Sequence, residues 1–226
     1  CMGAPVSLRG VSNLLDDTPI KFPSPDKRSC NGISQKTNEI FEANYDFAKA
    51  KSAYVWKTIV DPFIGKYSFI KVASGVIKSD DTLLNVEKGE EERLNKLYVL
   101  EGSKPYEVPE LHAGDIGAIA KLNSVQTGDS LAAKTAPVLY PKAVISTPYT
   151  CKRYKAVKKG DEDKISQALA KMTSEDKTLR AENDSANRQT LLYGMGDQHL
   201  DIIVNKLKDR YKVDIELSKP KVPFRE

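Results

Sequence analysis

Two kinds of hydrophobic pattern divide the chain. Over residues 54–131, short runs of β-branched and aromatic residues alternate with turn residues every eight to fourteen positions. This spacing predicts an antiparallel β-barrel, which avoids open strand edges by closing on itself. In the first run, Tyr54, Trp56 and Val60 share one parity and are expected to face the core.

Beyond residue 140 the pattern changes to strands mixed with helices. Strands are expected at 143–147, 178–182, 188–193 and 213–217. Apolar residues at helical spacing mark two amphipathic helices between them, Ile165, Ala168, Leu169 and Met172 in the first, and Leu200, Ile203, Val204, Leu207 and Tyr211 in the second. The order β-α-β-β-α-β predicts an α+β domain of the ferredoxin-like kind.

Residues 1–40 are expected to lie outside both domains. They contain one short apolar stretch at 11–15, and the prolines at 19, 23 and 25 are expected to block helix continuation. The polar segment 26–36 is typical of a flexible linker. The predicted multi-domain division is 1–40, the barrel at 41–139, the ferredoxin-like domain at 140–219, and the start of a further connection at 220–226.

A glycine-punctuated turn leads into the second helix. Gly194 and Gly196 suit a turn that needs unusual dihedrals or a close backbone approach, and Asp197 is expected to cap the helix. A phosphate-binding Walker loop would need Lys and then Ser or Thr after its last glycine, which Asp197 and Gln198 do not supply. His199 is expected to be structural, because residues two apart on a helix, such as His199 and Asp201, point in different directions.

Composition places the chain among ordinary globular proteins. Its 226 residues suffice for two domains, with 40% hydrophobic and 29% charged residues. No apolar run approaches the roughly 20 residues of a membrane span, and no signal peptide is recognisable, so we expect a cytoplasmic protein with no membrane partner. Three scattered cysteines and two histidines predict neither a disulfide framework nor a metal site.

The net charge of +4 is unevenly distributed. From residue 140 onward, 18 Lys and Arg stand against 13 Asp and Glu, a net charge of +5, whereas the preceding residues carry −1. A basic C-terminal part is compatible with a polyanionic partner such as RNA. A solvated lysine-rich surface is the alternative.

Several stretches resemble the elongation factor G family. Residues 194–201 are similar to the Gly-Met-Gly-Glu-Leu-His-Leu-Asp signature of its third domain, departing from it at Asp197 and Gln198. Residues 61–66, 72–75, 113–116 and 127–131 resemble, in order, the second domain of translational GTPases. Residues 10–16 and 23–25 resemble the last helix and the exit of the family's GTPase domain, so residues 1–40 are expected to be a remnant of that domain's C-terminal end and a linker. Residues 219–226 resemble the entrance to the family's fourth domain. Because the chain also begins with Cys1, we expect a piece of a longer protein.

The resemblance implies a role and a set of sites. Proteins of this family couple GTP hydrolysis, with magnesium, to movement of tRNA and mRNA through the ribosome. These two domains would dock on small-subunit ribosomal RNA and protein, and contact the parent's GTPase and C-terminal domains to relay the nucleotide state. Candidate RNA or ribosome contacts are Lys66, Arg93, Lys152, Arg153 and Lys155, the last three in an expected basic loop at 152–159. By position, candidate contacts in the cleft toward the GTPase domain are His199, Ile203 and Lys206.

No catalytic, cofactor-binding or metal-binding residue is predicted in this chain itself. It has no Walker loop, and Asn95-Lys96 and Asn205-Lys206 lack the Asp that a guanine-reading motif needs two residues later. GTP and magnesium would therefore belong to the parent, and this piece is expected to be inactive. Alternatives are a tetracycline-resistance-type ribosome protection protein, a non-translocating paralogue or, from another class, a free-standing RNA-binding protein.

Overall fold

The structure, a computed structural model, describes residues 3–24, 27–61, 65–102 and 104–222. The chain splits into two compact units, Cys1–Trp56 with Tyr67–Lys142, and Lys57–Lys66 with Ala143–Glu226. The motif residues at 62–64, the proline at 25 and the end of the chain at 223–226 lie outside the described residues, as does Cys1.

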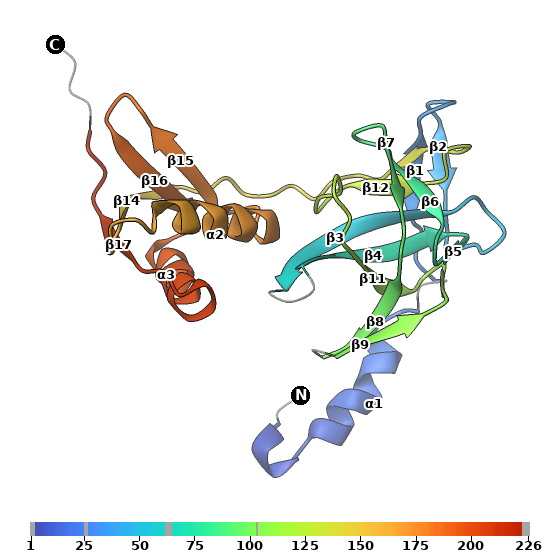
Figure 1. The fold of residues 1–226 in the computed structure, drawn as a ribbon. Coiled ribbons are helices and arrows are strands. Elements are labelled where there is room, and N and C mark those ends of the chain that lie inside the picture. Colours follow the sequence, from blue (N-terminus) through green and yellow to red (C-terminus); the bar gives the residue numbers. More distant parts are fainter. Residues whose placement is uncertain (1–2, 25–26, 62–64, 103, 223–226) are drawn as a thin grey trace. The chain divides into compact units, whose positions relative to one another are not determined.

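The first unit is built from β-strands (Figure 1). Its main sheet has the order β7-β6-β12-β3-β4-β11-β8-β9. These strands are β3 (Ser52–Asp61), β4 (Gly65–Ser74), β6 (Thr82–Asn85), β7 (Glu90–Arg93), β8 (Leu97–Glu101), β9 (Lys104–Val108), β11 (Ile116–Ala120) and β12 (Ser130–Ala132). A ribbon joins β5 (Val76–Lys78) to β10 (Glu110–His112), and a third sheet has the order β13-β1-β2, with β1 (Asn31–Ser34), β2 (Ile40–Glu42) and β13 (Val138–Leu139).

The main hydrophobic core of the unit lies inside these strands. Its largest fully buried side chains include Ile70, Ile77, Leu83, Leu97, Leu111, Ile119 and Leu131. On β3 the core-facing residues are Ala53 and Val55, while Trp56 is 44% exposed. The predicted parity of this strand was therefore wrong. Leu131 pairs directly with Ala53 in the sheet, so a small residue fits where the neighbouring strand already supplies a large one.

The N-terminal segment is more regular than expected. A short 3₁₀ helix (Pro5–Ser7) precedes helix α1 (Val11–Lys21), which continues through Pro19. The predicted break at this proline was wrong, because the last turn still closes through the Phe22 N–H, which donates to the Thr18 carbonyl at 3.0 Å. Asn31–Ser34 forms β1 between β13 and β2, so this part of the predicted flexible linker is a strand.

The second unit contains the predicted ferredoxin-like order. Its elements are β14 (Thr150–Ala156), α2 (Glu162–Glu175), β15 (Arg180–Asp184), β16 (Gln189–Gly194), α3 (Asp197–Tyr211) and β17 (Ile215–Ser218). The antiparallel sheet has the order β15-β16-β14-β17, and both helices cover one of its faces (Figure 1). The tip of the β3–β4 hairpin, Lys57–Lys66, also belongs to this unit.

The first strand of this unit differs from the prediction. Residues 143–147 form no strand, and β14 instead begins at Thr150 and contains the basic segment that was expected to be a loop. This strand lies in the middle of the sheet, paired with both β16 and β17. Tyr154 and Ala156 pack against the helices, and this apolar face stabilises a strand whose sequence is otherwise strongly charged.

The two predicted helix faces are confirmed. Ile165, Ala168, Leu169 and Met172 of α2 are buried, and so are Leu200, Ile203 and Leu207 of α3. They form one core with Leu192 of β16 and Ile215 of β17. Helix α3 is therefore fixed on the sheet along its whole length.

Replacing Ile203 by Asp should destabilise the second unit by at least about 3 kcal/mol, because it places an unpaired charge in the core and removes apolar contacts. Ile203 is 2% exposed, whereas its neighbour Ile202 is 52% exposed. Ile202→Asp, on the exposed surface of α3, is therefore the matched control. Urea unfolding followed by circular dichroism measures both variants, and equal midpoints would show that the buried face of α3 is wrongly assigned.

Candidate functional site

The glycine turn at 194–196 brings the end of β16 against the start of α3. A Cβ atom on Gly194 would lie 2.7 Å from Cδ2 of Leu200, so the close approach requires glycine here. Gly196 is extended, with φ 169°, and has no atom near an added Cβ, so the expected special conformation is wrong at this position. Gly196, not Asp197, is the N-cap, and the predicted side-chain cap is therefore also wrong. The Asp197 carboxylate instead pairs with Nζ of Lys152 at 2.9 Å.

His199 holds the turn to the end of α2. Its Nδ1 accepts a hydrogen bond from the Met195 N–H at 3.1 Å, so the ring hydrogen lies on Nε2, which donates to Asp176 at 3.0 Å. The Asp176 carboxylate also accepts from the Thr178 N–H and hydroxyl, at 2.9 and 2.6 Å. This arrangement agrees with the predicted structural role of His199.

These contacts set the acidity of Asp176. Partial burial alone would raise its pKa, but the hydrogen bonds from Thr178 and the nearby His199 outweigh burial, so the pKa lies below its usual value. The carboxylate is therefore charged at neutral pH. It is the anchor that joins the glycine turn of α3 to the C-terminal end of α2.

The three predicted cleft residues have different environments. Ile203 lies in the hydrophobic core, His199 is held by Asp176 and Met195, and Lys206 is exposed on α3. A direct contact with a partner domain is therefore open to Lys206 and to the edge of His199, whereas Ile203 acts through packing. The cleft itself stays a prediction.

The basic residues of β14 do not share one face. Lys152 points to the helix side, where it pairs with Asp197, while alternation along the strand puts Arg153 and Lys155 on the outer face. The strand pairing sets Arg153 opposite Ser218 of β17. Their predicted contact with RNA stays a prediction, and only Lys155 of the three is exposed, whereas Lys152 and Arg153 are half-buried.

The C-terminal segment after β17 is hydrogen-bonded to the start of β16. The Lys221 N–H donates to Oε1 of Gln189 at 2.8 Å, and Nε2 of Gln189 donates to the Lys221 carbonyl at 3.1 Å. Gln189 is 5% exposed. On β14, Nε of Arg153 is buried, with no hydrogen-bond partner among the described residues.

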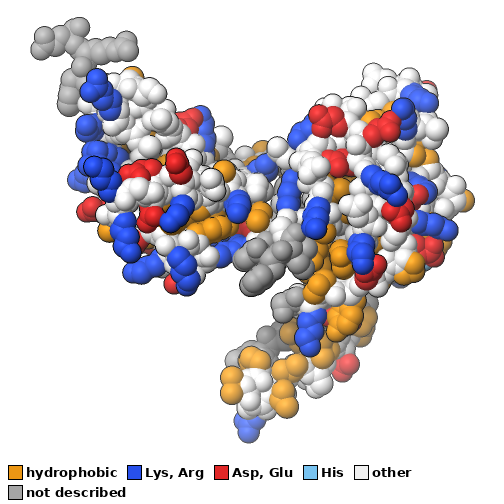
Figure 2. All heavy atoms as spheres, viewed as in Figure 1, with side chains coloured by type: hydrophobic (Ala, Val, Ile, Leu, Met, Phe, Trp, Pro, Cys, Tyr) orange, Lys and Arg blue, Asp and Glu red, His pale blue; other side chains and the backbone are white. Residues whose placement is uncertain are grey.

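The remaining predicted contacts, Arg93 and Lys66, lie in different units. Arg93 ends β7 and pairs with Oδ1 of Asp80 at 3.1 Å, while Lys66 begins β4 in the part of the hairpin that belongs to the second unit. Figure 2 shows Lys and Arg side chains interspersed with Asp and Glu over the visible surface. Within the second unit, Lys152 on one face of β14 and Arg153 and Lys155 on the other do not form one patch.

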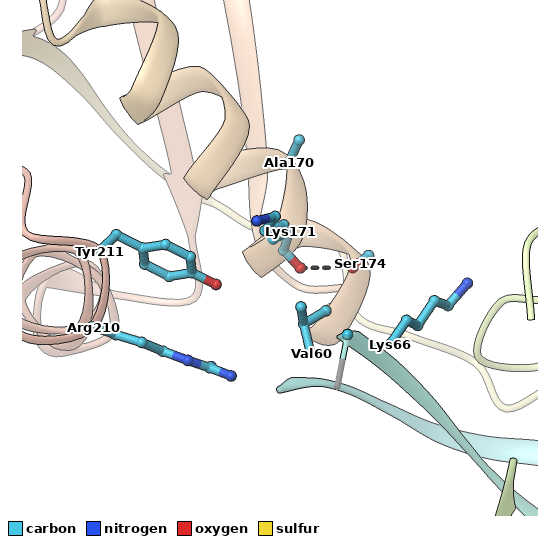
Figure 3. A pocket seen from close by; sticks show the side chains of 8 residues that line it. Val60, Lys66, Ala170, Lys171, Ser174, Arg210 and Tyr211 are labelled. Carbon is cyan, nitrogen blue, oxygen red and sulfur yellow. Dashed lines mark hydrogen bonds between the residues drawn. The ribbon is translucent and has the colours of Figure 1, made fainter. Parts of the chain in front are cut away.

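Lys66 lines a pocket of about 540 Å³ within the second unit (Figure 3). The pocket is surrounded by the end of β3, the start of β4, the last turns of α2 and the end of α3. Its lining consists of Val60, Gly65, Lys66, Ala170, Lys171, Ser174, Arg210 and Tyr211. Three of these side chains are cationic. Among the lining residues there is no carboxylate.

Glu175 balances part of this charge from beside the pocket. Both of its carboxylate oxygens lie 3.3 Å from Nη1 of Arg210, and Oε1 also accepts from the Val60 N–H at 2.6 Å. Lys171, in contrast, is exposed and forms no ion pair with a carboxylate of the described residues. The pocket therefore carries a surplus of positive charge at neutral pH.

Tyr211 adds an unused hydrogen-bond donor. Its hydroxyl is buried without a partner among the described residues, and Figure 3 shows it directed toward the interior of the pocket. Burial raises the pKa of Tyr211, although the neighbouring Arg210 opposes this, so the hydroxyl keeps its proton at neutral pH. Cations together with a protonated hydroxyl suit an anionic oxygen, as in a phosphate or carboxylate.

Sequence reasoning found only one member of this pocket. Lys171, Arg210 and Tyr211 were missed as site residues because they follow no motif and come from two helices some 40 positions apart. Tyr211 had been predicted only as a core residue, and it does lie against the core, half-buried. No signal in the sequence alone brings these groups together.

The described residues provide no metal centre. No group of three or more His, Cys, Asp or Glu side chains among them is arranged to hold an ion. The pocket lining offers cations and hydroxyls, which do not fit a magnesium ion. In the described part of the chain, no helix is long and apolar enough to cross a membrane.

Comparison with known proteins places both units in one family. Residues 50–134 match the family model described as elongation factor G domain 2, and residues 145–219 match the model described as elongation factor G, domain III. The chain belongs to the elongation factor G family, as its motifs predicted. The predicted fold class, a barrel-like β domain followed by an α+β domain, is confirmed as well.

A solved structure shares this fold. It is the crystal structure of ttk003000868 from Thermus thermophilus, which is 30% identical to this chain with a TM-score of 0.75. The match covers 95% of this chain and 30% of that one. The chain thus spans about a third of the length of this relative.

Replacing Asp176 by Asn should lower the stability of the second unit by about 1 kcal/mol at pH 7, since it removes a partly exposed charged acceptor. Because the pKa of Asp176 is lower in the folded state, its contribution is present above the unfolded pKa of about 3.9 and disappears as pH falls further. The difference in free energy of unfolding between Asp176→Asn and the unmodified chain should therefore shrink between pH 5 and pH 2, from about 1 kcal/mol toward zero.

Urea unfolding at a series of pH values measures this difference. Asp201→Asn, which removes an exposed carboxylate from α3, is the control and should show no such trend. A difference between Asp176→Asn and the unmodified chain that stays constant down to pH 2 would contradict the assigned network.

Proposed function

We propose that this chain is part of an elongation factor G-like translation factor that uses GTP hydrolysis to move tRNA and mRNA through the ribosome. In this proposal the GTPase centre lies elsewhere in the parent protein, and the two units described here dock on the ribosome in the cytoplasm and relay the nucleotide state. The observation that carries the proposal is the occurrence of both family domains, in the family's order, in one chain.

The pocket of the second unit supports the docking part of the proposal. Its surplus positive charge and buried tyrosine hydroxyl suit a phosphate of ribosomal RNA, for which cationic contacts supply most of the affinity. Lys66 was already expected to contact RNA or the ribosome. Lys171, Arg210 and Tyr211 now join it.

Helix α3 supports the relay. Its first turn is held by His199 and Asp176, and its last residues, Arg210 and Tyr211, line the pocket. The 15-residue helix is about 22 Å long. Because its buried face is packed along the whole length, a displacement at the glycine turn would reach the pocket as a movement of one rigid body.

Reversing two pocket charges should weaken ribosome binding. The double variant Lys66→Glu with Lys171→Glu should bind ribosomes at least about tenfold more weakly, because two phosphate contacts become repulsive. The double variant Lys36→Glu with Lys104→Glu changes the net charge equally at exposed positions of the first unit and is the control. Sedimentation with ribosomes at constant salt measures both, and equal losses in the two variants would mean that only overall charge matters.

The chain alone should show no guanine-specific, magnesium-dependent binding of GTP. In titration calorimetry, any saturable heat should be the same for GTP and ATP and should not depend on magnesium, because the sequence contains no Walker loop and no guanine-reading motif. A micromolar dissociation constant for GTP with magnesium that ATP does not match would contradict the assignment of GTP to another domain. For the parent protein, a ribosome-dependent translocation assay separates a translocase from a ribosome protection protein or a non-translocating paralogue.

A further inference from the structure

A second cavity lies in the first unit, apart from every residue considered so far as a site. Its volume is about 320 Å³, within the range of roughly 300–1,000 Å³ that is typical of small-molecule sites. Arg28 and Cys30 line it from the segment before β1, Tyr54 from β3 and Lys71 from β4. Tyr45 and Tyr140 complete the part of the lining that matters here.

The tyrosines form preorganised aromatic walls. The rings of Tyr54 and Tyr140 lie 5.8 Å apart at 50°, and the Tyr140 hydroxyl lies 2.6 Å from Oγ of Ser52, which fixes a ring that is only 5% exposed. Tyr45 hydrogen-bonds to the thiol of Cys30 and packs against the main core of the unit. Tyr45 and Tyr54 are only half-buried, and both line the cavity.

Two cations lie beside these rings. Nζ of Lys71 is 5.3 Å from the centre of the Tyr45 ring, and the positive charge of Arg28 acts on Cys30, Tyr45 and Tyr54 alike. Among the described residues no carboxylate pairs with Arg28 or Lys71. Burial raises the pKa of the Cys30 thiol and brings the pKa of Tyr45 to about 12, so neither group offers a negative charge at neutral pH.

We propose that this cavity binds one nucleotide, with its base against Tyr45 and Tyr54 and its phosphate between Arg28 and Lys71. Stacking on tyrosine accepts any base, and a guanidinium with an ammonium group suits a phosphate. The nucleotide can come from a free nucleoside phosphate or from an unpaired stretch of RNA. The site does not depend on the proposed ribosomal role, and Arg28, Cys30, Tyr45 and Tyr140 lie outside the residues that the family models match.

Equilibrium dialysis of the whole 226-residue chain against adenosine 5′-monophosphate tests this site directly. Arg28→Gln and Lys71→Gln should each weaken binding about tenfold, because each removes a charge-assisted contact to phosphate. Lys27→Gln removes an exposed charge next to the cavity without changing its lining and should stay within about twofold of the unmodified chain. Tyr45→Phe keeps the aromatic wall and should retain binding, whereas Tyr54→Leu should weaken it.

A thermal melt of each variant checks that it is folded. If a substitution at one of the half-buried positions 45, 54 or 71 prevents folding, the comparison of the exposed Arg28→Gln with its control Lys27→Gln is sufficient to test the site. No saturable binding of the nucleotide or of a six-residue oligoadenylate would overturn the proposal. Equal losses of affinity in Arg28→Gln and Lys27→Gln would also overturn it. So would full competition by inorganic phosphate together with no competition by adenosine, because the base would then play no part in binding. Tighter binding of the oligoadenylate identifies RNA as the source, and tighter binding of the monophosphate identifies a free nucleotide.

Discussion

The packing of α3 on the four-stranded sheet is the contact on which the second unit depends. Leu200, Ile203 and Leu207 bury one side of the helix, and Gly194 lets its first turn approach the end of β16 closely enough for this packing. The same contact sets the position of His199 at one end of the helix and of Arg210 and Tyr211 at the other. A larger residue at position 194 would press on the side chains of Leu200 and His199, which would have to shift.

Elements with a strong hydrophobic periodicity could be predicted from the sequence. Elements whose burial depends on contacts with residues distant in the sequence could not. Both amphipathic helices and the ferredoxin-like order followed from spacing alone. The basic strand β14 was misplaced because Lys152, Arg153 and Lys155 obscure its apolar alternation, and the Lys152 charge is balanced by Asp197, far along the chain. The parity of β3 depends on Leu131 opposite Ala53, a pairing that no local pattern contains.

The candidate sites show the same division. A glycine signature is contiguous and was recognisable, whereas each cavity gathers side chains from three or more separate segments. In both cavities the positive charge is local, although the whole chain carries only +4. Surface lysines elsewhere are interspersed with acids (Figure 2), so the ability to bind an anion depends on the charges gathered at each cavity rather than on the net charge of the chain.

The most direct test of the account is a cryo-electron microscopy structure of the parent protein on the ribosome with a non-hydrolysable GTP analogue. We expect the second unit to contact the ribosome and a phosphate of ribosomal RNA to lie between Lys66, Lys171 and Arg210, within hydrogen-bond distance of the Tyr211 hydroxyl. A ribosome-bound protein whose pocket faces solvent, or a protein that does not occupy the ribosome at all, would contradict it.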